Sequence, residues 1–196
     1  MQAEREEPAG DDADLLLAHA AGDAHAFARL YDRYDRPCFR YIRRMLGPAH
    51  AHDAEDLHQE TWIAVSRNAG AFDARKASFR AWLFTIARNK VFDQLRRQRV
   101  AVLAPAEERV VMEAPDTGLT PLEQVEAHEL ARRLVAAVET LPLEQRGAFV
   151  LFADAGLSLE EVARVTGVGM ETAKSRLRYA RATLRRLLAD ERPAYV

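Results

Sequence analysis

The chain has 196 residues, of which 48% are hydrophobic, and this length suits one or two small domains with apolar cores. The formal net charge of −2 hides a strong segregation of charge. Residues 75–99 hold eight Lys and Arg against one Asp, and residues 171–188 hold six against one Glu, whereas residues 1–14 and 107–126 each hold six acids and one Arg. Two basic segments separated by acidic ones predict two contact sites on a polyanion; ordinary solvated helix faces are the plainer alternative.

The cysteine count, the apolar runs and the motifs exclude several classes of protein. Cys38 is the single cysteine, so no intrachain disulfide can form and a reducing compartment is favoured. The acidic N-terminus lacks the apolar core of a signal peptide, and no run approaches the roughly 20 apolar residues of a membrane span. We therefore expect a cytoplasmic protein without membrane insertion. No Walker-type glycine loop, nucleophile elbow or paired catalytic carboxylates can be found, so we expect no enzymatic activity, no catalytic residue and no cofactor.

The first quarter of the chain is expected to form a helical scaffold after a disordered acidic tail at residues 1–12. A short helix is predicted over Asp14–Ala21. Asp23 is suited to cap a longer helix, which ends at Gly47 and Pro48. Pro37 is expected to kink or divide that helix, because proline lacks the backbone donor and its ring clashes with the preceding turn.

The next predicted helix, from Asp53 to about Arg67, carries a polar strip. At about 100° per residue, one face gathers side chains at the spacing i, i+3, i+4 and i+7. We call this set the acidic strip: Asp56, Gln59, Glu60 and Ile63. Three polar side chains and one apolar one suit contact with a basic protein surface. The other face is ordinary core and carries Leu57, Thr61, Ala64 and Val65, and Trp62 is also interpreted as a core residue.

Three histidines near this helix raise the question of a metal site. The spacing of His50, His52 and His58 matches no common ligand pattern, and the neighbouring carboxylates already have a role in the acidic strip. We therefore expect no bound metal.

A basic and aromatic helix is predicted from Ser78, its cap, to Arg99, after a turn-like segment at Asn68–Ala77. Its buried side carries Leu83, Phe84, Ala87, Val91 and Leu95. The opposite side carries Trp82, Thr85, Asn89, Asp93 and Arg96, flanked by Arg80, Arg88, Lys90, Arg97 and Arg99. The cations can bind phosphates, and the amide and carboxylate groups can form hydrogen bonds with base edges. An aromatic ring can stack on an unpaired base. This face therefore predicts nucleic-acid binding. Trp82 suits the core equally well.

The helical periodicity of apolar residues then ends, and residues 100–119 are predicted to form a flexible acidic linker. Helix formation resumes at Thr120, a suitable cap, followed by Pro121 at the first helical position and Glu123 at the capping-box position. The helix that starts there carries Leu122, Val125, Leu130, Leu134 and Val138. A further helix is predicted over Leu143–Ala155.

The C-terminal segment has the pattern of a helix-turn-helix. Ser158 and Glu161 form a capping box, Ala163 lies in a short helix, and Gly167 follows four residues later, before a basic helix from about Met170. The inward side chains are Ala173, Leu177, Ala180, Leu184 and Leu187. The outward ones are Glu171, Lys174, Ser175, Arg178, Arg181 and Arg185. The first turns are therefore expected to reach base edges and the later arginines phosphates.

Three motifs, taken in this order, resemble the bacterial RNA polymerase sigma factors of the extracytoplasmic-function class. Residues 53–61 (DAEDLHQET) resemble the polymerase-docking helix of the family, and residues 79–97 (FRAWL, IARN, then DQLRR) its promoter-melting helix. Residues 167–184, with TAKSRL at 172–177, resemble its upstream-element reader. Ala173 departs from the family, which usually has a β-branched residue there, and Gly169 and Met170 replace a more usual turn sequence.

The resemblance implies an all-α protein of two small helical domains joined by a flexible acidic linker, the C-terminal one a helix-turn-helix. Residues 13–99 would form the region-two-like domain and residues 120–190 the region-four-like domain. The acidic strip would dock on the clamp of the largest subunit of core RNA polymerase, and the C-terminal domain would meet the flap of the second largest. Promoter DNA and an anti-sigma factor are the other partners implied, in an envelope or environmental stress response. The DNA-binding residues would be Arg80, Trp82, Arg88, Asn89, Asp93, Arg96, Arg97, Glu171, Thr172, Lys174, Ser175, Arg178 and Arg181.

A free-standing repressor or activator is the main rival, with residues 14–99 as a ligand-binding or dimerising helical domain. It predicts a stable homodimer that binds specific DNA tightly without polymerase. This rival leaves the acidic strip unexplained, because DNA would repel those carboxylates.

Overall fold

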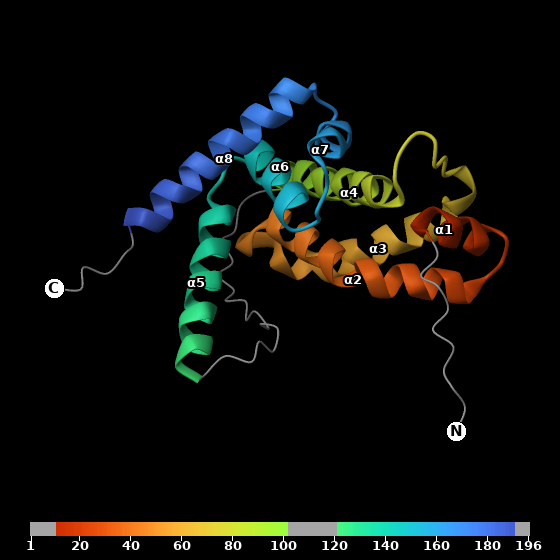
Figure 1. Ribbon diagram of the computed structural model, residues 1–196, viewed down its shortest axis with the longest axis horizontal. Helices are drawn as coiled ribbons and strands as arrows, with labels where there is room; N and C mark the ends of the chain where they lie inside the picture. Colours follow the sequence, from red (N-terminus) through yellow and green to blue (C-terminus); the bar gives the residue numbers. More distant parts are fainter. Residues whose placement is uncertain (1–10, 102–120, 191–196) are drawn as a thin grey trace.

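The computed structural model describes residues 11–101 and 121–190, and the described segments are helical without a strand (Figure 1). The two longest helices of the N-terminal half, α2 and α4, lie in one group with α1 and α3, and the remaining helices form a second group. The first group consists of α1 (Asp12–Ala20), α2 (Ala24–Leu46), α3 (Ala54–Arg67) and α4 (Phe79–Ala101), with the 3-10 turns η1 (Pro48–Asp53) and η2 (Ala69–Ala71). The second consists of α5 (Pro121–Glu139), α6 (Leu143–Ala153), α7 (Leu159–Thr166) and α8 (Met170–Asp190). The all-α expectation is confirmed.

Helix α2 runs unbroken through Pro37, so the expectation that proline divides it is wrong. The carboxylate of Asp23 caps the helix and accepts hydrogen bonds from the backbone N–H groups of His25 (2.8 Å) and Ala26 (3.2 Å). Tyr34 and Cys38 are buried on either side of Pro37. Burial of both flanks against the other helices stabilises the helical path, which offsets the one backbone hydrogen bond that proline cannot make.

The core of the N-terminal domain (α1–α4) is aromatic and tightly packed. The rings of Tyr41 on α2 and Phe84 on α4 meet edge to face at 5.4 Å, and both are fully buried. Leu16, Leu30, Ile42, Phe79 and Leu83 fill the same core. Edge-to-face contact adds about 0.5–1.5 kcal/mol beyond the burial of area. The predicted core side chains of α3 and α4 are thus buried or partly buried, which fixes the direction of their outward faces.

The C-terminal domain (α5–α8) contains the predicted helix-turn-helix. Ser158 Oγ accepts from the Glu161 backbone N–H, and the Glu161 carboxylate accepts from the Ser158 N–H, so the capping box is confirmed. Gly167 ends α7 with φ +68°, in the left-handed region. Ala173 and Leu177 are buried on α8, as expected. On α5, by contrast, Leu130 and Leu134 are 58% and 38% exposed; the cap predicted at Thr120 lies outside the described residues.

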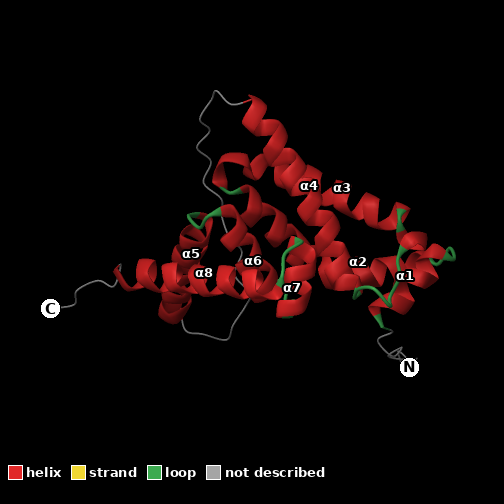
Figure 2. Ribbon diagram, turned by 90° about the horizontal axis from the view of Figure 1, so that it is seen from above, coloured by secondary structure: helices red, strands yellow, loops and turns green. Residues whose placement is uncertain are grey.

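The two domains pack against each other through α7 on α4 and α6 on α2. In Figure 1, α5 and α8 lie at the left, α1 at the right, and α4, α6 and α7 near the middle; Figure 2 shows the same arrangement from above. Residues 102–119 of the predicted linker and the tail at residues 1–10 lie outside the described residues. Within the described ranges, no helix is both long enough and apolar enough to cross a membrane.

Candidate protein-docking and nucleic-acid surfaces

The acidic strip lies on the solvent side of α3. All four of its side chains, Asp56, Gln59, Glu60 and Ile63, are exposed, and Ile63 is 42% exposed. Its opposite face is buried through Leu57, Thr61 and Val65, so the periodicity argument for this helix is confirmed. Glu60 also has a partner that the sequence did not indicate: its Oε2 lies 2.8 Å from Lys90 Nζ on α4. This ion pair joins the strip to the neighbouring helix.

A groove of about 400 Å³ lies beside the strip, between α2 and α3. Two members of the strip, Gln59 and Ile63, form part of its wall. The complete lining is Phe27, Tyr31, His58, Gln59, Trp62, Ile63, Ser66 and Arg67. The groove is therefore an aromatic hollow continuous with the strip. Sequence periodicity on one helix could not predict the groove, because its walls come from two different helices.

Trp62 and His58 form a buried pair at the back of this groove. Trp62 is 4% exposed, which confirms its interpretation as a core residue, and its Nε1–H donates to His58 Nε2 over 3.0 Å. Asp35 Oδ1 lies 3.3 Å from the same nitrogen. Burial lowers the pKa of His58 below its ordinary value of 6.5, and the opposing effect of Asp35 does not restore it. The neutral ring is the form that can accept from Trp62. Among the described residues, no group of three or more His, Cys, Asp or Glu is arranged to hold a metal ion.

The outward face of α4 is as the sequence predicted. Ser78 caps the helix by accepting from the Ala81 N–H at 3.1 Å. Asn89, Asp93, Arg96 and Arg97 are exposed, whereas Arg80 and Arg88 are partly buried. Asp93 and Arg96 form an ion pair at 3.2 Å, and the Arg88 guanidinium lies 4.2 Å from the centre of the Phe92 ring. The face thus presents mixed charges rather than a uniform cationic surface.

Trp82 and Arg80 have structural roles in addition to their position on this face. The Trp82 ring is partly buried, with ring centres 5.4 Å from Phe72 and 6.3 Å from Phe79. Arg80 lies over the Tyr34 ring at 5.8 Å and donates from Nη1 to the Gly156 carbonyl oxygen at 3.0 Å. Gly156 belongs to the C-terminal domain, so Arg80 joins the two domains. No motif in the sequence predicted this contact between the domains.

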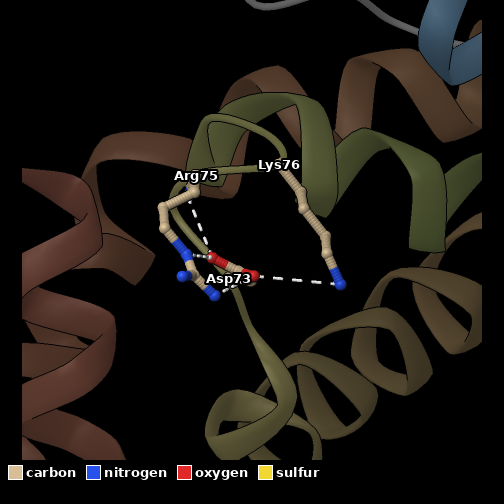
Figure 3. A network of polar contacts seen from close by, with 3 residues as sticks. All are labelled: Asp73, Arg75 and Lys76. Carbon is tan, nitrogen blue, oxygen red and sulfur yellow. Dashed lines mark hydrogen bonds and ion pairs between the residues drawn. The ribbon is translucent and has the colours of Figure 1, made fainter.

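The loop before α4 is ordered by Asp73. Its Oδ1 accepts from the backbone N–H and Nε of Arg75 at 3.1 and 3.0 Å, and its Oδ2 accepts from Nη2 at 3.0 Å. Lys76 Nζ lies 3.8 Å from the same carboxylate, as Figure 3 shows. These side-chain and backbone hydrogen bonds from Arg75 lower the pKa of Asp73. The loop before α4 therefore carries one carboxylate between two exposed cations, with a net charge of +1.

The second basic face lies on α8. Glu171, Thr172, Lys174, Arg178 and Arg181 are exposed, and Ser175 is partly exposed. Figure 1 shows α8 as the long helix at the upper left of the molecule. The structure adds Tyr179, which is 53% exposed and accepts a hydrogen bond from Arg178 at 3.3 Å. Tyr179 lies four residues after Ser175, so helical spacing alone would have placed it on this side. Arg181 lies 4.9 Å from the Phe152 ring and also contributes to packing.

Comparison with known families assigns both halves of the chain. Residues 30–100 match the family described as Sigma-70 region 2, and residues 131–184 match Sigma-70, region 4. The first match contains the acidic strip and the α4 face, and the second contains the helix-turn-helix. Both surfaces therefore lie within the matched segments, in the order that the motifs predicted.

Whole-chain relatives agree with these matches. The chain is 39% identical over 177 residues to the ECF RNA polymerase sigma factor SigM of Mycobacterium tuberculosis, covering 90% of this chain and 84% of SigM. Its fold is similar to CnrH in complex with the cytosolic domain of CnrY, with a TM-score of 0.67, 28% identity, and coverage of 92% of this chain and 99% of CnrH. It is also similar to RpoE of Bartonella quintana, solved with the anti-sigma factor NepR, with a TM-score of 0.62, 26% identity, and coverage of 83% and 98%. The chain belongs to the extracytoplasmic-function (ECF) class of RNA polymerase sigma factors.

Proposed function

We propose that this sigma factor docks on core RNA polymerase through the acidic strip, and that α4 and α8 are its two promoter-binding surfaces. The strip would contact the clamp of the largest subunit. The observation that carries this proposal is the position of the strip: exposed carboxylates and one exposed Ile on α3, in a chain whose other two outward faces are basic. A phosphate backbone would repel the strip, whereas a basic protein surface would attract it.

The aromatic groove supports this assignment. Ile63 lies at the junction of the strip and the groove, so an apolar side chain of a docked helix can enter the hollow while its basic residues face Asp56 and Glu60. Interfaces of this kind combine a desolvated apolar centre with a charged rim. The flap of the second largest subunit would meet the C-terminal domain, where Leu130 and Leu134 leave apolar surface exposed.

The α4 face is proposed to hold the non-template strand of melted promoter DNA. Asn89, Asp93 and Arg96 offer groups for base edges and phosphates, and Trp82 offers a partly exposed ring that packs on Phe72 and Phe79. Stacking of one base on such a ring is worth about 1–3 kcal/mol. Arg80, Arg88 and Arg97 would contact phosphates.

The α8 face is proposed to read the upstream element as duplex. Glu171, Thr172, Lys174 and Ser175 lie in its first two turns, which enter the major groove in helix-turn-helix proteins. Arg178 and Arg181 follow and would contact the backbone. We further infer that residues 13–99 and 120–190 act as separate domains joined by a linker at residues 100–119. We also infer that the protein acts in the cytoplasm, where the polymerase works.

An anti-sigma factor is the expected regulator. RpoE of Bartonella quintana, which this chain resembles in fold, is in complex with an anti-sigma factor. We infer that a protein of that class inhibits this chain as well, in a response to envelope or environmental stress.

The test compares the binding of two charge-reversal variants to purified core RNA polymerase. Asp56→Lys lies on the acidic strip, and Glu55→Lys is its matched control, since both are exposed acids in the first turn of α3. Each substitution loses a similar helix-dipole interaction, so both should be equally stable. Binding that is lost in Asp56→Lys and kept in Glu55→Lys supports the docking site. Equal binding by both variants would contradict it, and tight duplex binding by a homodimer without polymerase would favour the repressor.

A further inference from the structure

One ring nitrogen of His58 has two partners that make opposite demands on it. Its Nε2 lies 3.0 Å from Trp62 Nε1, which donates a hydrogen bond to it, and 3.3 Å from the carboxylate oxygen Oδ1 of Asp35. A nitrogen that accepts from Trp62 carries no proton, whereas one that donates to Asp35 must carry one. The nitrogen therefore satisfies only one of these partners at a time, and its protonation decides which.

Asp35 on α2 is the charged group that acts on the His58 ring. The titratable groups of α2 beside Asp35 are Tyr31 and Cys38, and both stay neutral. A hydrogen bond to Asp35 is the main cause that raises the pKa of Tyr31, and burial raises the pKa of the Cys38 thiol. The Phe39 ring, also on α2, meets the His58 ring edge to face with centres 5.6 Å apart. A change of charge in this cluster is therefore confined to His58 and its ion pair with Asp35.

The Trp62 ring forms the back of the aromatic groove and depends on His58 for its hydrogen bond. Its centre lies 4.9 Å from that of Tyr31 and 5.7 Å from that of Phe27, which in turn packs on the His19 ring of α1 at 4.5 Å. Trp62 is only 4% exposed. A buried N–H without an acceptor is strongly unfavourable, so protonation of His58 forces the indole to turn towards water. Since Trp62 lines the groove, that movement fills part of the hollow.

We propose that His58 is a pH switch for docking on core RNA polymerase. The neutral ring holds Trp62 at the back of the groove, whereas protonation commits the ring to Asp35, releases Trp62 into the groove and weakens docking. The proposal rests on the proposed docking at the acidic strip and the groove, because a side chain that docks beside Ile63 competes with the released indole for the same space. Burial lowers the pKa of His58 below 6.5, so docking is expected to have its full strength above that pH and to weaken as the pH falls further.

The experiment titrates the labelled full chain with core RNA polymerase at about pH 7.5 and at about pH 5.5, on either side of the ordinary pKa of histidine. The ratio of the two dissociation constants is compared between the wild type and His58→Gln, whose amide oxygen can accept from Trp62 but which does not titrate. Any pH response of the polymerase itself contributes equally to both ratios. We expect docking by the wild type to weaken at least about fivefold more than docking by His58→Gln, the lower end of usual coupling factors. Equal ratios would overturn the proposal.

Two further variants separate the switch from a merely structural role of His58. Asp35→Asn removes the carboxylate that favours the charged ring, so the loss of docking should move to lower pH. Trp62→Phe removes the N–H that protonation leaves without an acceptor, so docking by this variant should lose most of its pH dependence although His58 still titrates. An unchanged midpoint in Asp35→Asn, or full pH dependence in Trp62→Phe, would contradict the proposal.

Tryptophan fluorescence reports the switch without polymerase. The chain has two tryptophans, so Trp82→Phe leaves Trp62 as the single reporter. Its emission should move to longer wavelength as the pH falls below 6.5, because the indole becomes hydrated, and His58→Gln should abolish this shift. An emission that does not change with pH would overturn the proposal, as would a loss of helix in circular dichroism at about pH 5.5, which would attribute weak docking to unfolding.

The outcomes also separate this switch from the proposed function. Absence of core polymerase binding by the wild type at about pH 7.5 refutes the proposed function and with it the switch. Tight binding at that pH, with the same pH response in the wild type and in His58→Gln, refutes only the switch.

Discussion

The contribution of Ile63 to docking on core polymerase can be estimated from its exposed surface. The residue is 42% exposed, so somewhat less than half of its surface remains available for burial by a partner. Full burial of an isoleucine side chain is worth about 1.5–3 kcal/mol, and the exposed share therefore contributes about 1 kcal/mol to docking. Ile63→Ala should weaken binding to core polymerase about fivefold, since about 1.4 kcal/mol corresponds to a factor of ten.

The assay is a fluorescence titration of labelled protein with core polymerase, and Leu17→Ala is the matched control. Leu17 is 50% exposed on α1, two residues from the His19 ring that packs against Phe27, so it points away from the groove. Circular dichroism confirms that both variants are folded at the assay temperature. Equal affinities for Ile63→Ala and the wild type would rule out docking at Ile63, as would an equal loss of affinity in Leu17→Ala, because either result would show that affinity does not depend on burial of Ile63.

Three further predictions concern stability. Gly167→Ala should lower the free energy of unfolding by about 1–2 kcal/mol. The backbone conformation alone sets this loss, because φ is +68° there and no described atom lies within 4 Å of an added Cβ. Gly167→Asn should lower the free energy of unfolding by less, as measured by urea denaturation. Ser158→Ala removes the capping box and should lower stability by about 1 kcal/mol, with a drop in Tm of about 2–4 °C by calorimetry, and an unchanged Tm would refute the role of the cap. The lowered pKa of His58 means that the unfolded chain binds more protons than the folded one below pH 6.5. The stability due to neutral His58 is therefore complete above pH 6.5 and is lost as pH falls through its folded pKa, a dependence that His58→Gln should reduce in denaturation midpoints.

The sequence predicted the outward faces well, because each depends on helical periodicity within one segment. The acidic strip, the Ser78 cap and the Ser158 capping box are all local features of this kind. Helix α2 was the exception. Proline at position 37 disfavours helix locally, but burial of Tyr34 and Cys38 on either side of it outweighs that preference.

Features that join distant segments escaped sequence analysis for a physical reason. The Glu60–Lys90 ion pair, the groove between α2 and α3, and the four carbonyls around Arg146 each combine residues from different helices. Periodicity shows which side of a helix is outward but not what meets it. Arg80 shows the consequence: its position predicts a phosphate contact, and in the structure it donates a hydrogen bond to the Gly156 carbonyl oxygen.

We infer that the chain initiates transcription only together with core RNA polymerase. The most direct measurement is opening of a promoter fragment taken upstream of its own gene, with 2-aminopurine reporting unpaired bases, in reactions with the protein alone, core polymerase alone, and both. Opening is predicted only when both are present, and it should be lost with Asp56→Lys and retained with Glu55→Lys. Opening by core polymerase regardless of the protein, or tight duplex binding by a homodimer with no effect on core polymerase, would show that the chain is not an initiation factor of this kind.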